Sequence, residues 1–167
     1  MAKSVVWTVV FVFVAAVLQS TLLARVALFG AVPDLALGVA VYAAYVNGMM
    51  AGQLSGFFGG LTLDLVSAAP IGMNALVRTL LGALTGLARG KVVLDWFLAP
   101  MVLSAAATLL KAALLFVLGL VFGGEVPHYR PDAALLWAEL ALNTLSAPLL
   151  FAMLRRFGAL LAVKGVT

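Results

Sequence analysis

Between Leu35 and Ala88 the chain runs for 54 residues with only two charged side chains, Asp64 and Arg78. A water-soluble domain does not leave so long a stretch nearly uncharged, because about 25% of its residues carry a charge. In this chain only 10% of the residues are charged, 65% are hydrophobic, and the mean hydropathy is +1.21. Lipid must therefore be the solvent, and the sequence predicts an all-α integral membrane protein.

The lengths of the apolar runs predict six spanning helices, since one crossing takes about 20 residues. The uncharged run from Ser4 to Ala24 exceeds the core of a signal peptide, about 7–15 residues, so we interpret it as a retained helix. The long run described above fits three helices, with breaks at Asn47-Gly48 and at Ala69-Pro70-Ile71-Gly72. We expect a single polytopic domain over residues 1–167, with spans at about 4–24, 35–50, 52–69, 71–89, 97–122 and 132–154.

Lysines and arginines outside the spans predict the orientation, because short cytoplasmic loops are enriched in them. An even number of spans places both chain ends on the same side of the membrane. That side carries Lys3, Arg89, Lys91, Arg155, Arg156 and Lys164. The opposite side carries only Arg25 and Arg130. Both termini are therefore expected in the cytoplasm.

Glycines recur at intervals of four residues in two of the predicted spans. They are Gly52, Gly56 and Gly60 in the third span, and Gly82, Gly86 and Gly90 in the fourth. This spacing places each set on one helix face. Helices in lipid associate through close backbone approach and dispersion, which small residues permit. We expect these faces to pack the third and fourth spans tightly, either on each other or on the helix of a partner.

Four ionisable residues lie within the predicted spans: Asp64, Arg78, Lys111 and Glu139. A charge at the bilayer centre costs ~3 kcal/mol or more, so such a residue normally pairs with another group or lines a path. The turn between the third and fourth spans predicts an Asp64–Arg78 pair, with Asn74 on the same face as Arg78. Lys111 and Glu139 form the second expected pair. A structural role in fixing helix register is favoured over a proton path, because each acid has a base and the only histidine lies in a predicted loop.

Signatures of catalysis are absent from the sequence. The chain has no cysteine, one histidine, no HExxH motif and no Walker-type loop. Metal ligands at the usual spacings are absent as well. We therefore expect no enzymatic activity, no catalytic residues, no cofactor and no metal site. The few basic residues are scattered, not gathered in a stripe with interleaved aromatics, so no nucleic-acid partner is expected.

Several short motifs in the first half of the chain are specific in combination. They are Leu18-Gln19-Ser20-Thr21-Leu22, Pro33-Asp34-Leu35, Gly56-Phe57-Phe58-Gly59-Gly60-Leu61-Thr62-Leu63-Asp64, Pro70-Ile71-Gly72-Met73-Asn74, and then Gly82 and Gly86. With these motifs the chain resembles the MreD family, the rod shape-determining membrane proteins of bacteria. The part after about Lys91 matches that family only in hydropathy.

The resemblance implies a non-enzymatic scaffold of the cell-elongation complex in the bacterial inner membrane, supporting peptidoglycan synthesis and cell shape. The implied partner is an MreC-like protein with one spanning helix. The actin-like MreB, a SEDS-type glycosyltransferase and a penicillin-binding protein complete the implied complex. The family's six-helix fold is similar to the substrate-binding subunits of energy-coupling-factor transporters.

That likeness defines the alternative function, a vitamin- or small-molecule-binding subunit of such a transporter. This function needs an outward pocket in which a few polar groups converge. The outer ends of the predicted spans offer Asp34, Asp64, Asn74 and the loop around His128. A third possibility, an ion channel, needs a polar face on a repeated helix, and the sequence supplies none.

Overall fold

The computed structural model describes residues 1–27, 30–66, 70–90, 97–122 and 134–162, and these residues form helices and no β-strand. The long helices are α1 (Ala2–Thr21), α2 (Leu35–Asn47), α3 (Met49–Val66), α4 (Met73–Leu87), α5 (Leu98–Phe122) and α6 (Ala134–Arg156). Two short elements, η1 (Leu23–Val26) and α7 (Gly158–Leu161), follow α1 and α6. Each of the six predicted spans overlaps one long helix, and the ends differ by a few residues.

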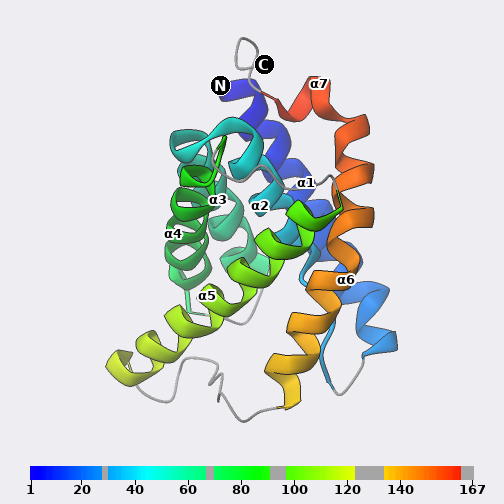
Figure 1. Cartoon of the computed structure of the whole chain (residues 1–167). Coiled ribbons are helices and arrows are strands. Elements are labelled where there is room, and N and C mark those ends of the chain that lie inside the picture. Colours follow the sequence, from blue (N-terminus) through cyan, green and yellow to red (C-terminus); the bar gives the residue numbers. More distant parts are fainter. Residues whose placement is uncertain (28–29, 67–69, 91–96, 123–133, 163–167) are drawn as a thin grey trace.

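Helix α2 occupies the middle of the bundle and packs on all five other long helices (Figure 1). Its residues from Ala36 to Ala44 are all buried, which explains why no polar side chain occurs along this stretch apart from the Tyr42 hydroxyl. At 1.5 Å per residue the helix is only about 20 Å long. It therefore begins inside the bundle, where surrounding protein can satisfy the polar groups of its first turn.

The start of α1 and the short helix α7 lie at the same end of the bundle (Figure 1). The hydroxyl of Ser4 in α1 donates to the carbonyl of Leu161 in α7. The Asn47 amide, at the end of α2, donates to Ser4 Oγ at 3.1 Å and to the Leu161 carbonyl at 2.8 Å. Arg89, just after α4, donates to the Asn47 carbonyl at 3.3 Å. These bonds tie together helix ends that are far apart in sequence.

The two glycine faces pack α3 against α4, backbone to backbone. A Cβ added at Gly56 would lie 2.2 Å from the Arg78 carbonyl oxygen, and one at Gly60 would lie 2.4 Å from the Asn74 carbonyl oxygen. Cβ atoms added at Gly52, Gly82 and Gly86 would also meet backbone of the facing segment, at 2.1 to 2.5 Å. Because α3 and α4 cover each other here, these glycines offer no free face to a partner. Gly90 has nothing near its Cβ position and is outside this contact.

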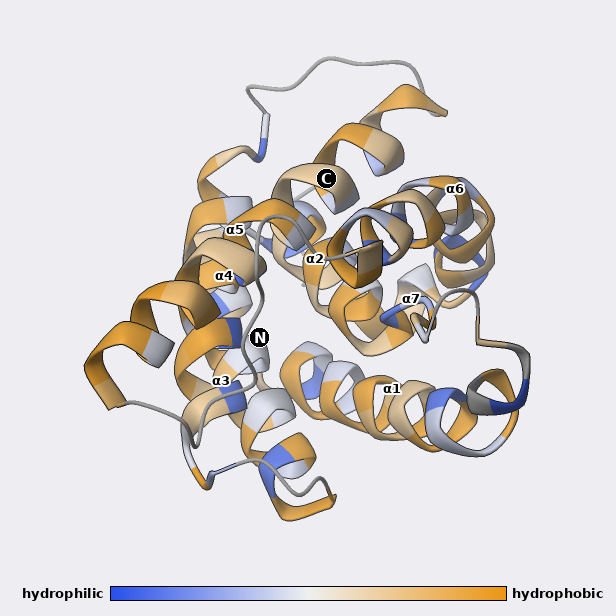
Figure 2. Ribbon diagram, turned by 90° about the horizontal axis from the view of Figure 1, so that it is seen from below, coloured by the Kyte–Doolittle hydropathy of each residue, from blue (hydrophilic) through white to orange (hydrophobic). Residues whose placement is uncertain are grey.

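Three of the described helices, α1, α5 and α6, are long and apolar enough to cross a membrane. Helices α2 and α4 are apolar but shorter. Hydrophobic positions dominate the ribbon on every side (Figure 2). Large side chains such as Leu145 and Leu149 in α6 are 71% and 77% exposed, an arrangement that suits lipid and not water.

Candidate functional site

The first turn of α2 carries the acid around which the buried charges gather. Asp34 is the N-cap of this helix, and its side chain accepts a hydrogen bond from the Leu37 backbone N–H at 2.8 Å. Its own backbone N–H donates to Asn143 Oδ1 of α6 at 2.6 Å. An aspartate before an apolar helix is a standard cap, so local sequence fixes where this carboxylate lies.

Two bases from different helices converge on that carboxylate. Arg78 Nη2 of α4 lies 3.2 Å from Asp34 Oδ1 and 3.3 Å from Oδ2. Lys111 Nζ of α5 lies 2.6 Å from Asp34 Oδ2 and 2.7 Å from Glu139 Oε1 of α6. Asp34, Arg78, Lys111 and Glu139 are called the charge centre below. It joins α2, α4, α5 and α6.

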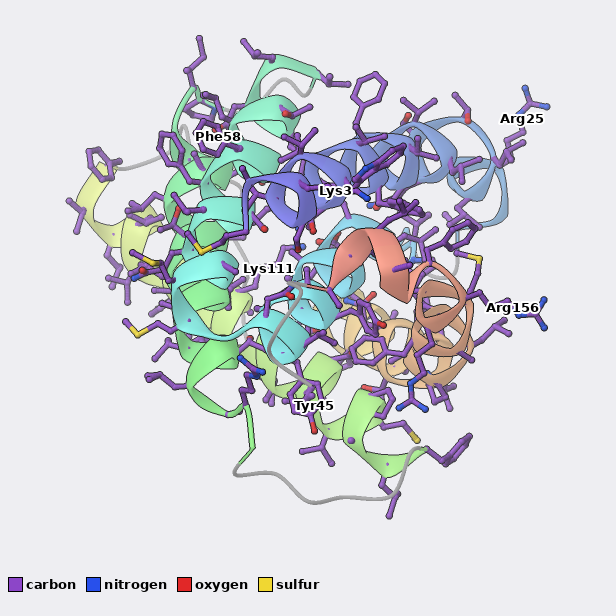
Figure 3. The ribbon with its side chains drawn as sticks, turned by 90° about the horizontal axis from the view of Figure 1, so that it is seen from above. Lys3, Arg25, Tyr45, Phe58, Lys111 and Arg156 are labelled. Carbon is purple, nitrogen blue, oxygen red and sulfur yellow. The ribbon has the colours of Figure 1, made fainter. Side chains whose placement is uncertain are left out.

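The charge centre is neutral, with two acids and two bases, and it is buried. Exposed fractions of the four side chains are between 6% and 16%. In contrast, the labelled Arg25 and Arg156 project away from the bundle, whereas Lys111 lies within it (Figure 3). Attraction between opposite charges is strong where water is excluded, and neutrality avoids the several kcal/mol that one uncompensated buried ion costs.

A neutral hydrogen-bonded chain extends the centre toward α5. The amide of Asn143 donates to Thr108 Oγ1 at 3.0 Å, and that hydroxyl donates to the Ser104 carbonyl at 2.8 Å. Asn143 thus connects the start of α2 with α5. Its amide and carbonyl oxygen are both used, so its orientation is fixed.

The predicted Asp64–Arg78 pair is wrong. The Asp64 carboxylate accepts from backbone N–H groups at the start of α4: Gly72 at 2.9 Å, Asn74 at 2.9 Å and Ala75 at 3.1 Å. The first turn of a helix has N–H groups without internal partners and a positive end of its dipole, and both favour a carboxylate. Asp64 therefore caps α4 from α3, and Arg78 lies one turn further along, where it bonds to Asp34.

The other predicted residues are placed as follows. The Lys111–Glu139 ion pair is present, but it shares its lysine with Asp34. Asn74 contributes its backbone N–H to Asp64, and it lines a cavity beside the charge centre. From sequence alone, Asp34 lies at a span end and in the motif Pro33-Asp34-Leu35, outside the predicted set of ionisable residues within the spans. Its position before an apolar helix was the signal that could have included it.

Replacing Asp64 with alanine is expected to destabilise the protein by about 1–3 kcal/mol, because buried N–H groups at the start of α4 lose their acceptor. Asp64→Asn, which retains one side-chain oxygen, should lose less. Thermal unfolding of the detergent-purified protein measures both. Ser55→Ala is the matched control on the same helix, since the buried Ser55 hydroxyl has no partner among the described residues. Equal losses for Asp64→Ala and Ser55→Ala would contradict the capping role.

A cavity of about 370 Å³ lies beside the charge centre, between α1, α3, α4, α5 and the start of α2. Its polar lining comes from Gln19, Asp34, Asn74, Arg78 and Lys111, with Ser20 at its rim. Ser20 and Val66, which also lines it, are exposed at the ends of α1 and α3. The cavity thus reaches the surface at the end of the bundle opposite the start of α1.

Within the described residues no cluster of three or more His, Cys, Asp or Glu side chains could hold a metal ion. Each charged member of the charge centre bonds to an opposite charge. The arrangement can fix four helices relative to one another, and it can present positive groups to the cavity.

Long apolar helices around a neutral charge centre define this chain as a helical membrane protein. The family model described as rod shape-determining protein MreD matches residues 1–157 of the 167. The chain belongs to the MreD family, as the motifs between Leu18 and Gly86 indicate. Comparisons with curated proteins and with solved structures gave no significant match. Family membership assigns the chain to rod shape determination and to a family of structural membrane proteins not known as enzymes.

Proposed function

We propose that this chain is a non-enzymatic scaffold of the bacterial cell-elongation complex and that it holds the spanning helix of an MreC-like protein. The observation that carries the proposal is the family match over nearly the whole chain. In this role the protein supports peptidoglycan synthesis and cell shape. An MreB filament, a SEDS-type glycosyltransferase and a penicillin-binding protein belong to the same complex.

The charge centre supports a scaffold role because its acids and bases are paired with one another. A proton path needs a carboxylate that can take up and release protons. Asp34 bonds to two bases, and Glu139 bonds to one of these. Ion pairs between four helices instead fix their register, which suits a protein that presents a constant surface.

The glycine faces, which the sequence leaves open as a packing surface for a partner, are not the partner surface in this proposal. Those glycines lie against facing backbone between α3 and α4. The partner helix must then pack on apolar side chains of other helices. Exposed examples are Val6 in α1, Phe116 in α5 and Leu149 in α6. In this proposal the chain is a multi-pass protein of the inner membrane, with both termini in the cytoplasm.

Co-expression tests the scaffold. Tagged chain and an MreC-like protein are extracted in mild detergent, and the proposal expects the two to purify together. In the matched control the partner keeps its extracytoplasmic domain but carries an unrelated spanning helix of equal length, and co-purification should be lost. A chain that purifies alone in both cases would contradict the proposal, and retention of the control would place the contact outside the membrane.

The cavity favours a second candidate, the substrate-binding subunit of an energy-coupling-factor transporter. Its volume of about 370 Å³ falls within the usual range for small-molecule sites, about 300–1,000 Å³. Such a subunit would bind a vitamin-like molecule and would assemble with an ATP-hydrolysing module. Co-purification of that module with the chain, in place of an MreC-like protein, is the result that would favour this candidate.

A further inference from the structure

Arg78 is buried with part of its hydrogen-bonding capacity unused. Its side chain is only 7% exposed. Nη2 bonds to Asp34, whereas Nε and Nη1 have no acceptor among the described residues. A buried donor without an acceptor costs about 1–3 kcal/mol, and more when the donor belongs to a charged group. A guanidinium in this condition is a strong binding group for an additional acceptor.

More basic than acidic side chains line the cavity beside Arg78. The ionisable side chains that line it are one acid, Asp34, and two bases, Arg78 and Lys111. Glu139, the second acid of the charge centre, bonds to Lys111 and does not line the cavity. Gln19 and Asn74 add neutral polar groups that can also donate hydrogen bonds.

We propose that this cavity binds an oxyanion, a phosphate or carboxylate group, against the guanidinium of Arg78. An oxyanion supplies the acceptors that Arg78 Nε and Nη1 lack, and its several oxygens can accept from more than one edge of the planar donor group. The inference concerns a ligand of the chain and does not depend on the scaffold role.

The shape of the cavity allows two sources for the oxyanion. Its exposed rim at Ser20 and Val66 lies at the ends of α1 and α3, and Ala16 and Leu63 make part of its wall apolar. A lipid could place its headgroup phosphate beside Arg78 and leave its chains at the rim. A small soluble carboxylate or phosphate could enter by the same rim.

The test compares Arg78→Lys with wild type. Lysine keeps a positive charge for Asp34 but lacks the Nε and Nη1 donors. Arg89→Lys is the matched control, because Arg89 lies at the other end of the bundle and bonds to the Asn47 carbonyl. Native mass spectrometry measures retention of dioleoyl-phosphatidylglycerol and of dioleoylglycerol, which has the same chains without phosphate. Thermal unfolding with inorganic phosphate or acetate measures soluble oxyanions.

The expected result is that at least one oxyanion probe binds wild type and Arg89→Lys equally and binds Arg78→Lys about tenfold more weakly, the loss typical of one charge-assisted hydrogen bond. Preference for phosphatidylglycerol over dioleoylglycerol identifies a lipid source; stabilisation by phosphate or acetate identifies a soluble one. No binding of any oxyanion probe, or equal binding by all variants, would overturn the proposal.

A second variant keeps the test decisive if Arg78→Lys does not fold. Asn74→Leu changes a residue that lines the cavity and whose side chain makes no hydrogen bond among the described residues. It should weaken oxyanion binding while the charge centre stays intact. Wild-type affinity in Asn74→Leu, with Arg78→Lys unfolded, would count against the cavity as the site.

Discussion

Asp34→Asn is expected to lower the free energy of unfolding by about 3–5 kcal/mol, the usual cost of removing one partner from a buried ion pair. Asparagine is as good an N-cap as aspartate, so the bond to the Leu37 N–H can persist and the loss reports the charge alone. The variant leaves Arg78 and Lys111 with only Glu139, and a buried net positive charge results. Thermal unfolding in detergent, and the yield of folded protein from membranes, measure the loss.

Two double variants separate neutrality from the loss of a single bond. Asp34→Asn with Arg78→Met leaves the Lys111–Glu139 pair, whose atoms lie 2.7 Å apart, and should recover part of the stability. Asp34→Asn with Glu139→Gln leaves two bases without an acid and should be the least stable of the three. Residues in one network are not additive, so recovery in the first double variant is the diagnostic result. If both double variants lost equally, charge balance would not be what holds these helices together.

The charge centre was only partly predictable from the sequence. Counting charges within apolar runs found Arg78, Lys111 and Glu139, and it paired the last two correctly. The same count assigned Asp64 to Arg78, because the turn between their helices brings both to similar depth. Depth alone does not separate an ion pair from a helix cap. The backbone N–H groups of α4, which bind Asp64, carry no sequence signal of their own.

The helices themselves were predictable because lipid imposes a simple rule on length and polarity. Two predictions from the sequence are confirmed: the described residues form an all-helical fold, and the chain belongs to the predicted family. The central place of α2 was not evident, since a buried helix and a lipid-facing helix are equally apolar. Because the sequence does not show that this helix is central, Asp34 reads from sequence as an ordinary polar residue at a span end. Only the structure shows that residues of α4, α5 and α6 bond to this span end.

Gly82→Ala should lower the free energy of unfolding nearly as much as Asp34→Asn does, although it adds a single methyl group. That Cβ would lie 2.1 Å from the Gly52 carbonyl oxygen and 2.6 Å from its carbonyl carbon. Backbone atoms cannot rotate away as a side chain would, so α3 and α4 must separate along the whole contact. Overpacking of this kind typically costs about 1–3 kcal/mol and sometimes more. We expect the upper part of that range or beyond it.

Separation of α3 and α4 should also reach the charge centre, because the Arg78 carbonyl oxygen lies against Gly56 in the same contact. Gly119→Ala in α5 is the matched control: a helical glycine with nothing within 4 Å of its added Cβ. That variant should be neutral or slightly stabilising, since alanine favours helix over glycine. Thermal unfolding of the two variants, with binding of an MreC-like partner measured alongside, tests whether the glycine contact sets the shape that the partner recognises. Wild-type stability in Gly82→Ala would mean that the two helices can part without cost, and the rigid scaffold would lose its basis.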